Sequence, residues 1–267
     1  VDRYIGNLQT GRVVTVFART GGGKTTFGLQ VAANLVLNGY KVIYGSSEMS
    51  RREVFTKMAS SNASVAYKSI NENTINDSEK SKIAEFMSKI ISNKFYVSIE
   101  NDLNKFINEI KLYKLQNNLD VVFVDYVNKY VDHNDRDLMT NKIGKISGLF
   151  KNLAVEENLC VVLIAQANRI VDKKGGDAAV EKLESSDIQD SARIEQDSDQ
   201  VIGLYRNVKL DDKIYRDKLF RLGKLKYESK NADENPECIN AVIIKNRHGE
   251  RGTCALRWNG RFSRISD

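Results

Sequence analysis

A glycine-rich segment, Ala18–Thr25, separates an apolar run from an amphipathic stretch and constrains this chain more than any other feature. The apolar run, Arg12–Ala18, reads as a strand, and the stretch Thr25–Asn38 places apolar side chains at helical spacing. Glycines allow successive backbone N–H groups to surround phosphate oxygens, and the amino end of a helix adds partial positive charge there. The segment therefore predicts a strand, a phosphate-binding loop and a helix in direct succession.

The residues around this loop are of the types that bind a nucleotide. Lys24 can reach the terminal phosphates of ATP or another nucleoside triphosphate, and the Thr25 hydroxyl can ligate Mg²⁺. The usual pattern of such loops has glycine where Ala18 stands, so a glycine-rich turn without a ligand is the alternative. The predicted nucleotide-binding residues are Ala18, Arg19, Thr20, Gly21, Gly22, Gly23, Lys24, Thr25 and Thr26.

Six short apolar runs predict the strands of a mostly parallel sheet. Most of these runs are continuous rather than alternating, as expected for strands that are buried on both faces. They are Arg12–Ala18, Lys41–Tyr44, Phe95–Ile99, Asp120–Asp125, Cys160–Gln166 and Gln200–Tyr205. Helical patterns lie between the runs, so we expect an α/β fold with helices flanking the sheet. Two later runs, Ile239–Lys245 and Gly252–Trp258, predict a C-terminal antiparallel hairpin.

Three polar residues lie at or just after the ends of predicted strands. Because the carboxyl ends of parallel strands meet at one edge of a sheet, we expect them near the phosphate loop. Asp125 is predicted to hold Mg²⁺ through water, and Glu48 to act as the base that activates an attacking water. The amide of Gln166 is placed to report the presence of a γ-phosphate. For each residue the alternative is an ordinary polar side chain at the end of a strand.

Two cations, Lys245 and Arg247, lie at the start of the predicted hairpin turn. Since they are two residues apart on an extended strand, their side chains project to the same face. Such a pair suits contact with a phosphate at a subunit boundary. A solvated basic hairpin is the alternative that the spacing leaves open.

Composition narrows the class of protein. The chain of 267 residues is 41% hydrophobic and 28% charged, which is ordinary for a globular protein, and its apolar runs are too short for a membrane span. A net charge of +6 permits nucleic-acid binding without establishing it. Cys160, Cys238 and Cys254 show no metal-binding spacing, so we expect buried thiols and a reducing, intracellular compartment.

Taken in order, these motifs resemble the C-terminal motor domain of DnaB-type hexameric replicative helicases, which are RecA-like P-loop NTPases. The resemblance covers nearly the whole chain. The matching segments are Ala18–Thr25, Ser47–Met49, Asp125 with Tyr126, Gln166–Arg169, Asp187–Asp197, Lys245–Gly249 and Trp258–Arg264. The family's own phosphate loop often has alanine at its first position, so Ala18 fits the resemblance.

The resemblance implies roles for the remaining motifs. Arg247 would be an arginine finger and Lys245 its companion, both reaching into the ATP site of the neighbouring subunit. Gln189, Asp190 and Arg193 would contact DNA from a central loop, although the family usually has a basic residue where Gln189 stands and a small one where Arg193 stands. The implied partners are single-stranded DNA, further copies of the chain in a hexamer, and a primase or helicase loader, with no membrane.

The same resemblance predicts the domain organisation. We expect residues 1–267 to form one RecA-like motor domain, with a polar insertion at 207–237 and with the family's N-terminal collar or a primase domain outside this chain. The expected location is the cytoplasm of a bacterial cell or phage-infected host. Two other classes stay open: a RecA-like recombinase or recombination mediator, and a regulatory nucleotide-binding protein that does not hydrolyse its nucleotide.

Overall fold

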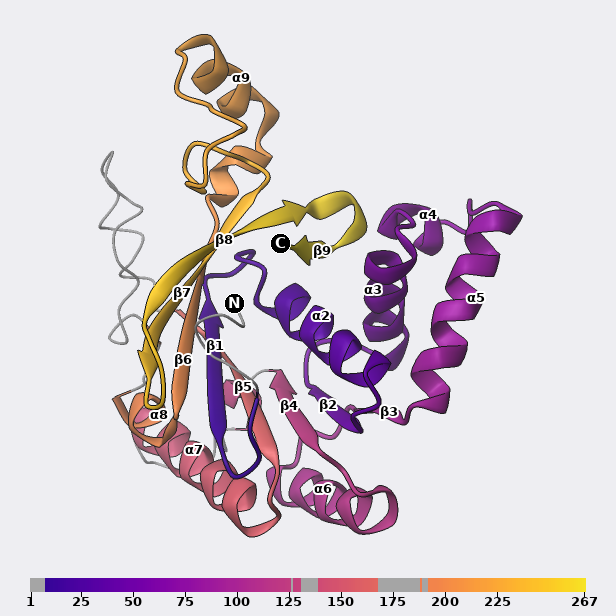
Figure 1. Ribbon diagram of the computed structural model, residues 1–267, viewed down its shortest axis with the longest axis vertical. Coiled ribbons are helices and arrows are strands. Elements are labelled where there is room, and N and C mark those ends of the chain that lie inside the picture. Colours follow the sequence, from indigo (N-terminus) through magenta and orange to yellow (C-terminus); the bar gives the residue numbers. More distant parts are fainter. Residues whose placement is uncertain (1–7, 126, 131–138, 168–187, 189–191) are drawn as a thin grey trace.

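A computed structural model describes residues 8–125, 127–130, 139–167, 188 and 192–267. Its parallel strands are β1 (Val13–Ala18), β2 (Val42–Ser46), β3 (Phe95–Ser98), β4 (Val121–Asp125), β5 (Cys160–Gln166) and β6 (Gln200–Tyr205). Its antiparallel strands are β7 (Cys238–Asn246), β8 (Gly252–Asn259) and β9 (Arg264–Ser266). The described strands form one sheet in the order β3-β2-β4-β5-β1-β6-β7-β8-β9 (Figure 1).

Helices connect the strands. Those before β5 are α2 (Lys24–Leu37), α3 (Arg51–Ala63), α4 (Tyr67–Asn71), α5 (Asp77–Ser92), α6 (Leu103–Asn117), the 3₁₀ turn η1 (Val127–Tyr130) and α7 (Met139–Glu156). Those after β5 are α8 (Ala192–Asp197), η4 (Val208–Asp211), α9 (Lys213–Arg221) and η5 (Gly260–Phe262). No described helix has the length and apolar character needed to cross a membrane.

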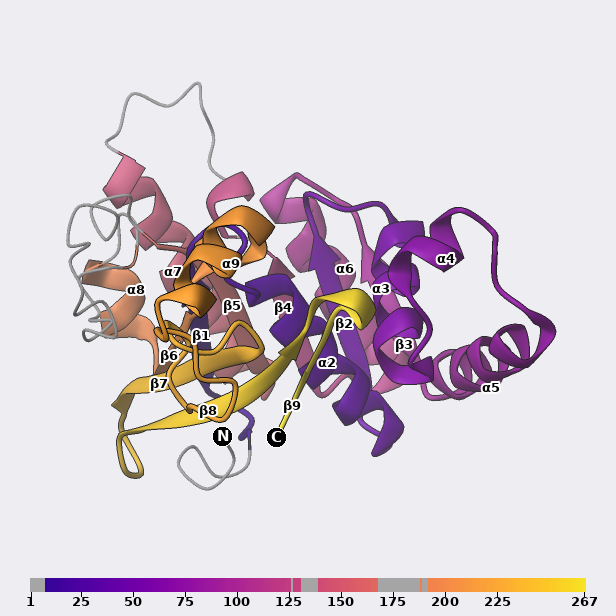
Figure 2. The same ribbon diagram turned by 90° about the horizontal axis from the view of Figure 1, so that it is seen from above.

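Successive strand residues point to opposite faces of the sheet, and helices cover both faces of its parallel part. On one face α2, α3 and α5 pack against alternate strand residues such as Val14 and Val16. On the other face α6, α7 and α8 pack against the intervening residues, such as Val13 and Phe17. Figure 2 shows α2 and α7 on opposite sides of the central strands. This double cover explains why the strand sequences are continuous apolar runs.

The predicted α/β architecture is confirmed. All six predicted parallel strands are present, with ends that differ by at most two residues, and the C-terminal hairpin forms from β7 and β8. The short β9, which no apolar run predicted, pairs with β8. Cys160 and Cys238 are buried free thiols as expected, whereas Cys254 is half-buried.

The polar connection at 207–237 is ordered and lies between β6 and β7. It contains η4 and α9, and in Figure 1 α9 stands beyond the end of the sheet. Its base is tied to the body by the Tyr205 hydroxyl, which donates to Asp233 at 2.5 Å, and by Asn240, which donates to the carbonyl of Lys230 at 2.9 Å. Helix α9 itself buries no residue. The connection is therefore a well-anchored base that carries an exposed helix.

Candidate functional site

The phosphate loop joins β1 to α2, and its backbone needs glycine at several positions. Gly21 and Gly23 have φ angles of 75° and 90°, which side chains with a β-carbon rarely adopt. Gly22 donates its N–H to the carbonyl of Arg19 at 2.8 Å, and a β-carbon at Gly22 would lie 2.9 Å from that same oxygen. The tight turn therefore depends on the glycines that the sequence supplies.

Close packing of α2 brings the loop to the sheet. A β-carbon at Gly28 would lie 2.6 Å from Cδ1 of Ile164 on β5, so a larger residue there would displace the end of that side chain. Lys24 and Thr25 open this helix, with Thr26 next to them on its first turn. Both Lys24 and Thr25 lie close enough to Asp125 at the end of β4 to lower the pKa of its carboxyl group.

Asp125 is a buried carboxylate that is held by a buried tyrosine. The hydroxyl of Tyr44 on β2 donates to Oδ2 of Asp125 at 2.7 Å. Burial raises the pKa of Asp125 above its ordinary value, although the Tyr44 hydrogen bond and the charge of Lys24 act in the opposite direction. The same burial, with the nearby Asp125 charge, raises the pKa of Tyr44, so its hydroxyl stays a donor.

These residues fit a magnesium site of the kind that nucleotides complete. Oδ1 of Asp125 is buried and has no hydrogen-bond partner among the described residues, although an acceptor in that position ordinarily has one. Across the described part of the chain, no group of three or more His, Cys, Asp and Glu side chains could hold a metal. Mg²⁺ in such proteins takes one carboxylate, a hydroxyl, waters and phosphate oxygens, so Asp125 and Thr25 suffice from the protein.

Glu48 lies beside Asp125 because two serines fold the end of β2 onto the end of β4. The backbone N–H of Ser47 donates to the carbonyl oxygen of Asp125 at 2.9 Å, and the Ser47 hydroxyl donates to the same oxygen at 3.0 Å. Ser46 closes the turn by donating to the carbonyl of Met49 at 2.9 Å. Glu48 is exposed, and its charge is close enough to raise the pKa of Asp125. A water activated by Glu48 would thus stand next to the metal site.

Gln166 contacts the phosphate loop directly. It ends β5, where it pairs with Ala18 at the end of β1. Its Nε2 donates to the hydroxyl of Thr20 at 3.0 Å. The predicted sensor amide is therefore in contact with the loop whose occupancy it would report. Asn168 and Arg169, which follow it, lie outside the described residues.

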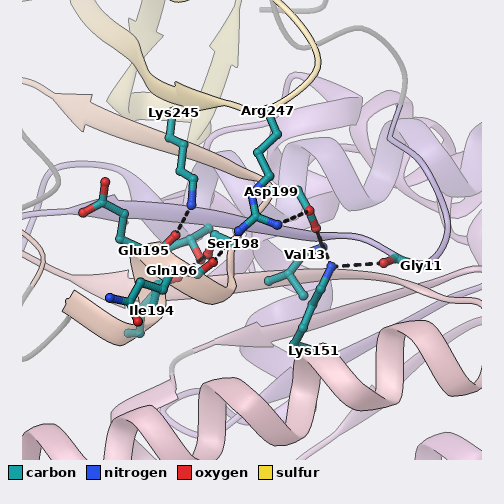
Figure 3. Close-up of polar contacts among 11 residues, drawn as sticks. Gly11, Val13, Lys151, Ile194, Glu195, Gln196, Ser198, Asp199, Lys245 and Arg247 are labelled. Carbon is teal, nitrogen blue, oxygen red and sulfur yellow. Dashed lines mark hydrogen bonds and ion pairs between the residues drawn. The ribbon is translucent and has the colours of Figure 1, made fainter.

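Lys245 and Arg247 lie at the other end of the sheet. Lys245 is in the last residues of β7 and Arg247 follows that strand, next to the amino ends of β1 and β6, whereas the phosphate loop follows the carboxyl end of β1. The six residues of β1 alone separate the two ends by roughly 17 Å. Both cations turn toward α8, where Lys245 donates to the carbonyl of Glu195 and Arg247 to that of Gln196 (Figure 3). Their predicted common face is confirmed, and both are remote from the phosphate loop of their own chain.

The structure describes only part of the set of residues that the resemblance assigns to DNA contact. Gln189 and Asp190 lie outside the described residues, as does Tyr126. Arg193 is exposed on α8, with its aliphatic stem over Gly144 of α7. A β-carbon at Gly144 would lie 2.6 Å from Cδ of Arg193, so a larger residue there would displace the Arg193 side chain.

The sequence assigned no role to three residues that build the site, although Ser47 belongs to one of the matching segments. Tyr44 and Ser47 hold Asp125, and Arg206 at the end of β6 donates to the carbonyl of Gly21 at 3.3 Å. Arg206 also bonds both carboxylate oxygens of Asp211 at 2.7 Å and stacks 4.5 Å from the centre of the Trp258 ring. Ser47 and Arg206 follow the carboxyl ends of β2 and β6, so the strand-end rule that selected Gln166 could also have found Arg206, whereas Tyr44 lies inside β2.

Comparisons with known proteins agree on one family. The family model described as "DnaB-like helicase C terminal domain" matches residues 1–267. A probable plasmid replicative DNA helicase of Chlamydia psittaci is 27% identical over 98% of this chain and 54% of its own length. The replicative DNA helicase DnaB of Haemophilus influenzae is 27% identical over 100% of this chain and 53% of its own length. The chain thus spans about half the length of the curated relatives it matches.

Comparison with solved structures identifies the fold. A solved ATPase domain superposes with a TM-score of 0.81 at 25% identity, covering 100% of this chain and 88% of the other. A DnaB-like replicative helicase, solved in a study of its interactions with primase, superposes with a TM-score of 0.82 at 24% identity, covering 99% and 59%. The fold is therefore the RecA-like fold of these ATPase domains, as the resemblance predicted.

Proposed function

We propose that this chain is the ATP-hydrolysing motor of a replicative DNA helicase, because it belongs to the family of DnaB-like helicase C-terminal domains. The observation that carries this proposal is the separation of the site into two parts. Lys24, Asp125 and Glu48 gather at the carboxyl edge of the sheet, and Lys245 and Arg247 lie at the opposite edge. A second copy of the chain is needed to bring the two parts together.

Within one copy the phosphate loop binds and orients the nucleotide. Backbone N–H groups of the loop and Lys24 hold the phosphates, while Thr25 and Asp125 would hold Mg²⁺, which would supply positive charge to neutralise the phosphate oxygens. Glu48 accepts a proton from the attacking water. The amide of Gln166 donates toward the terminal phosphate in place of its present bond to Thr20.

The neighbouring copy completes the site. We infer that its Arg247 and Lys245 contact the terminal phosphate and stabilise the charge that develops during transfer, a contribution of about 10³–10⁵ in rate for arginine fingers. Repeating this head-to-tail contact closes a ring, which we infer to be a hexamer. The single domain 1–267 acts as the motor, and 207–237 is an insertion on it.

The proposed substrate track is single-stranded DNA, held through its backbone by central loops that include Gln189, Asp190 and Arg193. Binding through phosphates without base readout gives affinity that is tolerant of sequence and sensitive to salt. A primase or a helicase loader is the further partner proposed, because a structural relative was solved in a study of its interactions with primase. The proposed location is the cytoplasm of a bacterial cell or of a phage-infected host.

The proposal is tested by measuring ATP turnover with and without single-stranded DNA for Glu48→Ala and Arg247→Ala. Each substitution should lower DNA-stimulated turnover by about 100-fold or more, because each removes a group that acts only in the transition state. Arg251→Ala, at an exposed position of the same hairpin, and Glu72→Ala, at the exposed end of α4, are the matched controls. Unchanged turnover in both site variants would refute the assignment.

A further inference from the structure

Lys245 and Arg247 are both held by the carboxyl end of α8. The carbonyl groups in the last turn of a helix have no partner within the helix and carry partial negative charge. Here the carbonyl of Glu195 accepts from Lys245, and that of Gln196 accepts from Nη2 of Arg247 at 2.6 Å (Figure 3). The end of α8 is thus satisfied by two side chains from β7 and the residue after it.

Asp199, just before β6, supplies the charge at this junction. Its side chain is only 6% exposed. One oxygen, Oδ1, pairs with Nη1 of Arg247 at 3.3 Å, while Oδ2 pairs with Lys151 at 2.8 Å and accepts the backbone N–H of Val13 at 2.9 Å. Burial alone would raise the pKa of Asp199, but the bonds from Lys151 and Val13 and the two cationic charges outweigh it and lower the pKa.

The backbone around Asp199 fixes its place. Its N–H donates to the carbonyl of Val13 at 2.8 Å, and its carbonyl accepts the N–H of Arg247 at 3.0 Å. Ser198, the residue before it, donates through its hydroxyl to the carbonyl of Ile194 at 2.6 Å and shares a hydrogen bond with Thr15 at 2.7 Å. The junction therefore connects β1, β6, α8 and the hairpin in one network of short contacts.

The guanidinium of Arg247 is held by Asp199 and Gln196, and the side chain stays partly exposed. Its guanidinium has more N–H donors than its contacts with Asp199 and Gln196 use, and 44% of the side chain is exposed. A long arginine side chain loses substantial rotamer entropy when it is fixed in one place. Holding it in advance removes that cost from the step in which it meets a phosphate.

We propose that Asp199 is a positioning residue, which together with the end of α8 aims Arg247 and Lys245 at the nucleotide of a neighbouring copy. This inference rests on the proposed function, because it requires that the two cations act in a second copy. Asp199 acts through Arg247 and touches no substrate. Its loss should therefore impair only the copy that donates the cations, and should leave the phosphate loop of the same copy intact.

Rings assembled from two different variants separate the donation of cations from the binding of phosphates. Lys24→Ala copies donate cations without a working phosphate loop, and Arg247→Ala copies offer a phosphate loop without the finger, so mixing them should restore DNA-stimulated ATP turnover. The double variant Lys24→Ala/Asp199→Asn should restore about tenfold less turnover than Lys24→Ala does. Conversely, mixing Arg247→Ala/Asp199→Asn copies with Lys24→Ala copies should restore as much ATP turnover as mixing Arg247→Ala copies with Lys24→Ala copies.

The two directions of mixing also control for folding. An Asp199→Asn copy that still supplies a competent phosphate loop is folded, so a deficit confined to cation donation cannot come from misfolding. Lys151→Met added to the Lys24→Ala copy removes the other ion pair of Asp199 and should leave rescue within about twofold of the Lys24→Ala value, since Arg247 keeps its contact. If Asp199→Asn does not fold, the combined Lys151→Met/Asp199→Asn change removes the buried pair as a unit and is used instead.

The outcomes are distinguishable. Rescue by Lys24→Ala/Asp199→Asn at the level of Lys24→Ala would overturn the role of Asp199 and leave the proposed function standing. Equal deficits in both mixing directions would also overturn it, by showing a general structural effect. Absence of any rescue between Lys24→Ala and Arg247→Ala would overturn action between copies, and the role of Asp199 with it.

Discussion

The carboxylate of Asp125 shows how one buried residue depends on its neighbour. It is 4% exposed, and burial disfavours its charged form. Tyr44, which is fully buried, donates to one oxygen and leaves the other, Oδ1, without a partner among the described residues. The hydrogen bond therefore both favours the ionised carboxylate and fixes which oxygen is offered to a metal.

We expect Tyr44→Phe to weaken magnesium-dependent nucleotide binding about three- to tenfold, because one buried hydrogen bond contributes about 1 kcal/mol. The measurement is a fluorescent-nucleotide titration at several Mg²⁺ concentrations, with binding in the absence of Mg²⁺ as the internal reference. Tyr130→Phe is the matched control, since the Tyr130 hydroxyl is buried but has no hydrogen-bond partner among the described residues. Identical Mg²⁺ dependence in wild type and Tyr44→Phe would contradict the prediction.

The connection between β6 and β7 has two parts, a base that packs against the domain and an exposed helix, α9. Its base includes Arg206, whose side chain is 5% exposed and links Asp211, Trp258 and the carbonyl of Gly21. Its outer part, α9, buries no residue and rests on η4 through a bond from Arg216 to the carbonyl of Leu210. The base supports the phosphate loop, whereas α9 contributes little to the body of the domain.

Replacing Lys213–Arg221 with a Gly/Ser linker of the same length should therefore change the free energy of unfolding by less than about 1 kcal/mol and leave nucleotide affinity unaltered.

Arg206→Ala should lower the free energy of unfolding by about 2 kcal/mol and weaken nucleotide binding, since it removes the stacked cation beneath the loop. Urea unfolding and a nucleotide titration measure both quantities. A larger loss of stability from the linker than from Arg206→Ala would show that the division into base and arm is wrong.

The whole molecule places its two sets of candidate site residues at opposite ends of one sheet. The phosphate loop, Asp125, Glu48 and Gln166 share the carboxyl edge, and Lys245, Arg247 and Asp199 share the other. The length of the sheet strands keeps these two ends apart within one copy of the chain. Catalysis that uses both sets therefore requires association of at least two copies.

ATP turnover per chain should consequently rise with protein concentration until assembly is complete. Specific activity measured from about 10 nM to about 10 µM should follow the fraction of assembled rings found by mass photometry over the same range. Arg251→Ala should give the same curve as the wild type, and Arg247→Ala should stay low throughout. Constant specific activity in a range where single chains predominate would argue against a site shared between copies.

The features that could be predicted from the sequence are those that depend on short stretches of chain. The loop Ala18–Thr25 and the apolar runs that became β1 to β6 carry their own signals, because glycine backbone freedom and strand burial act over a few residues. Asp125 and Gln166 followed from one general rule, that parallel strands share a carboxyl edge. The roles of Lys245 and Arg247 came from the resemblance, since their spacing alone also fitted a solvated hairpin.

Tertiary structure decided which distant residues touch. Tyr44 reached Asp125 only because β2 pairs with β4, and Asp199 met Arg247 only because β7 pairs with β6. Such contacts depend on strand order and register, which no local pattern encodes, so neither Tyr44 nor Asp199 stood out in the sequence. The chain by itself determined a phosphate loop on an α/β sheet. The long-range packing decided that Tyr44 holds Asp125 and that Lys245 and Arg247 meet the end of α8.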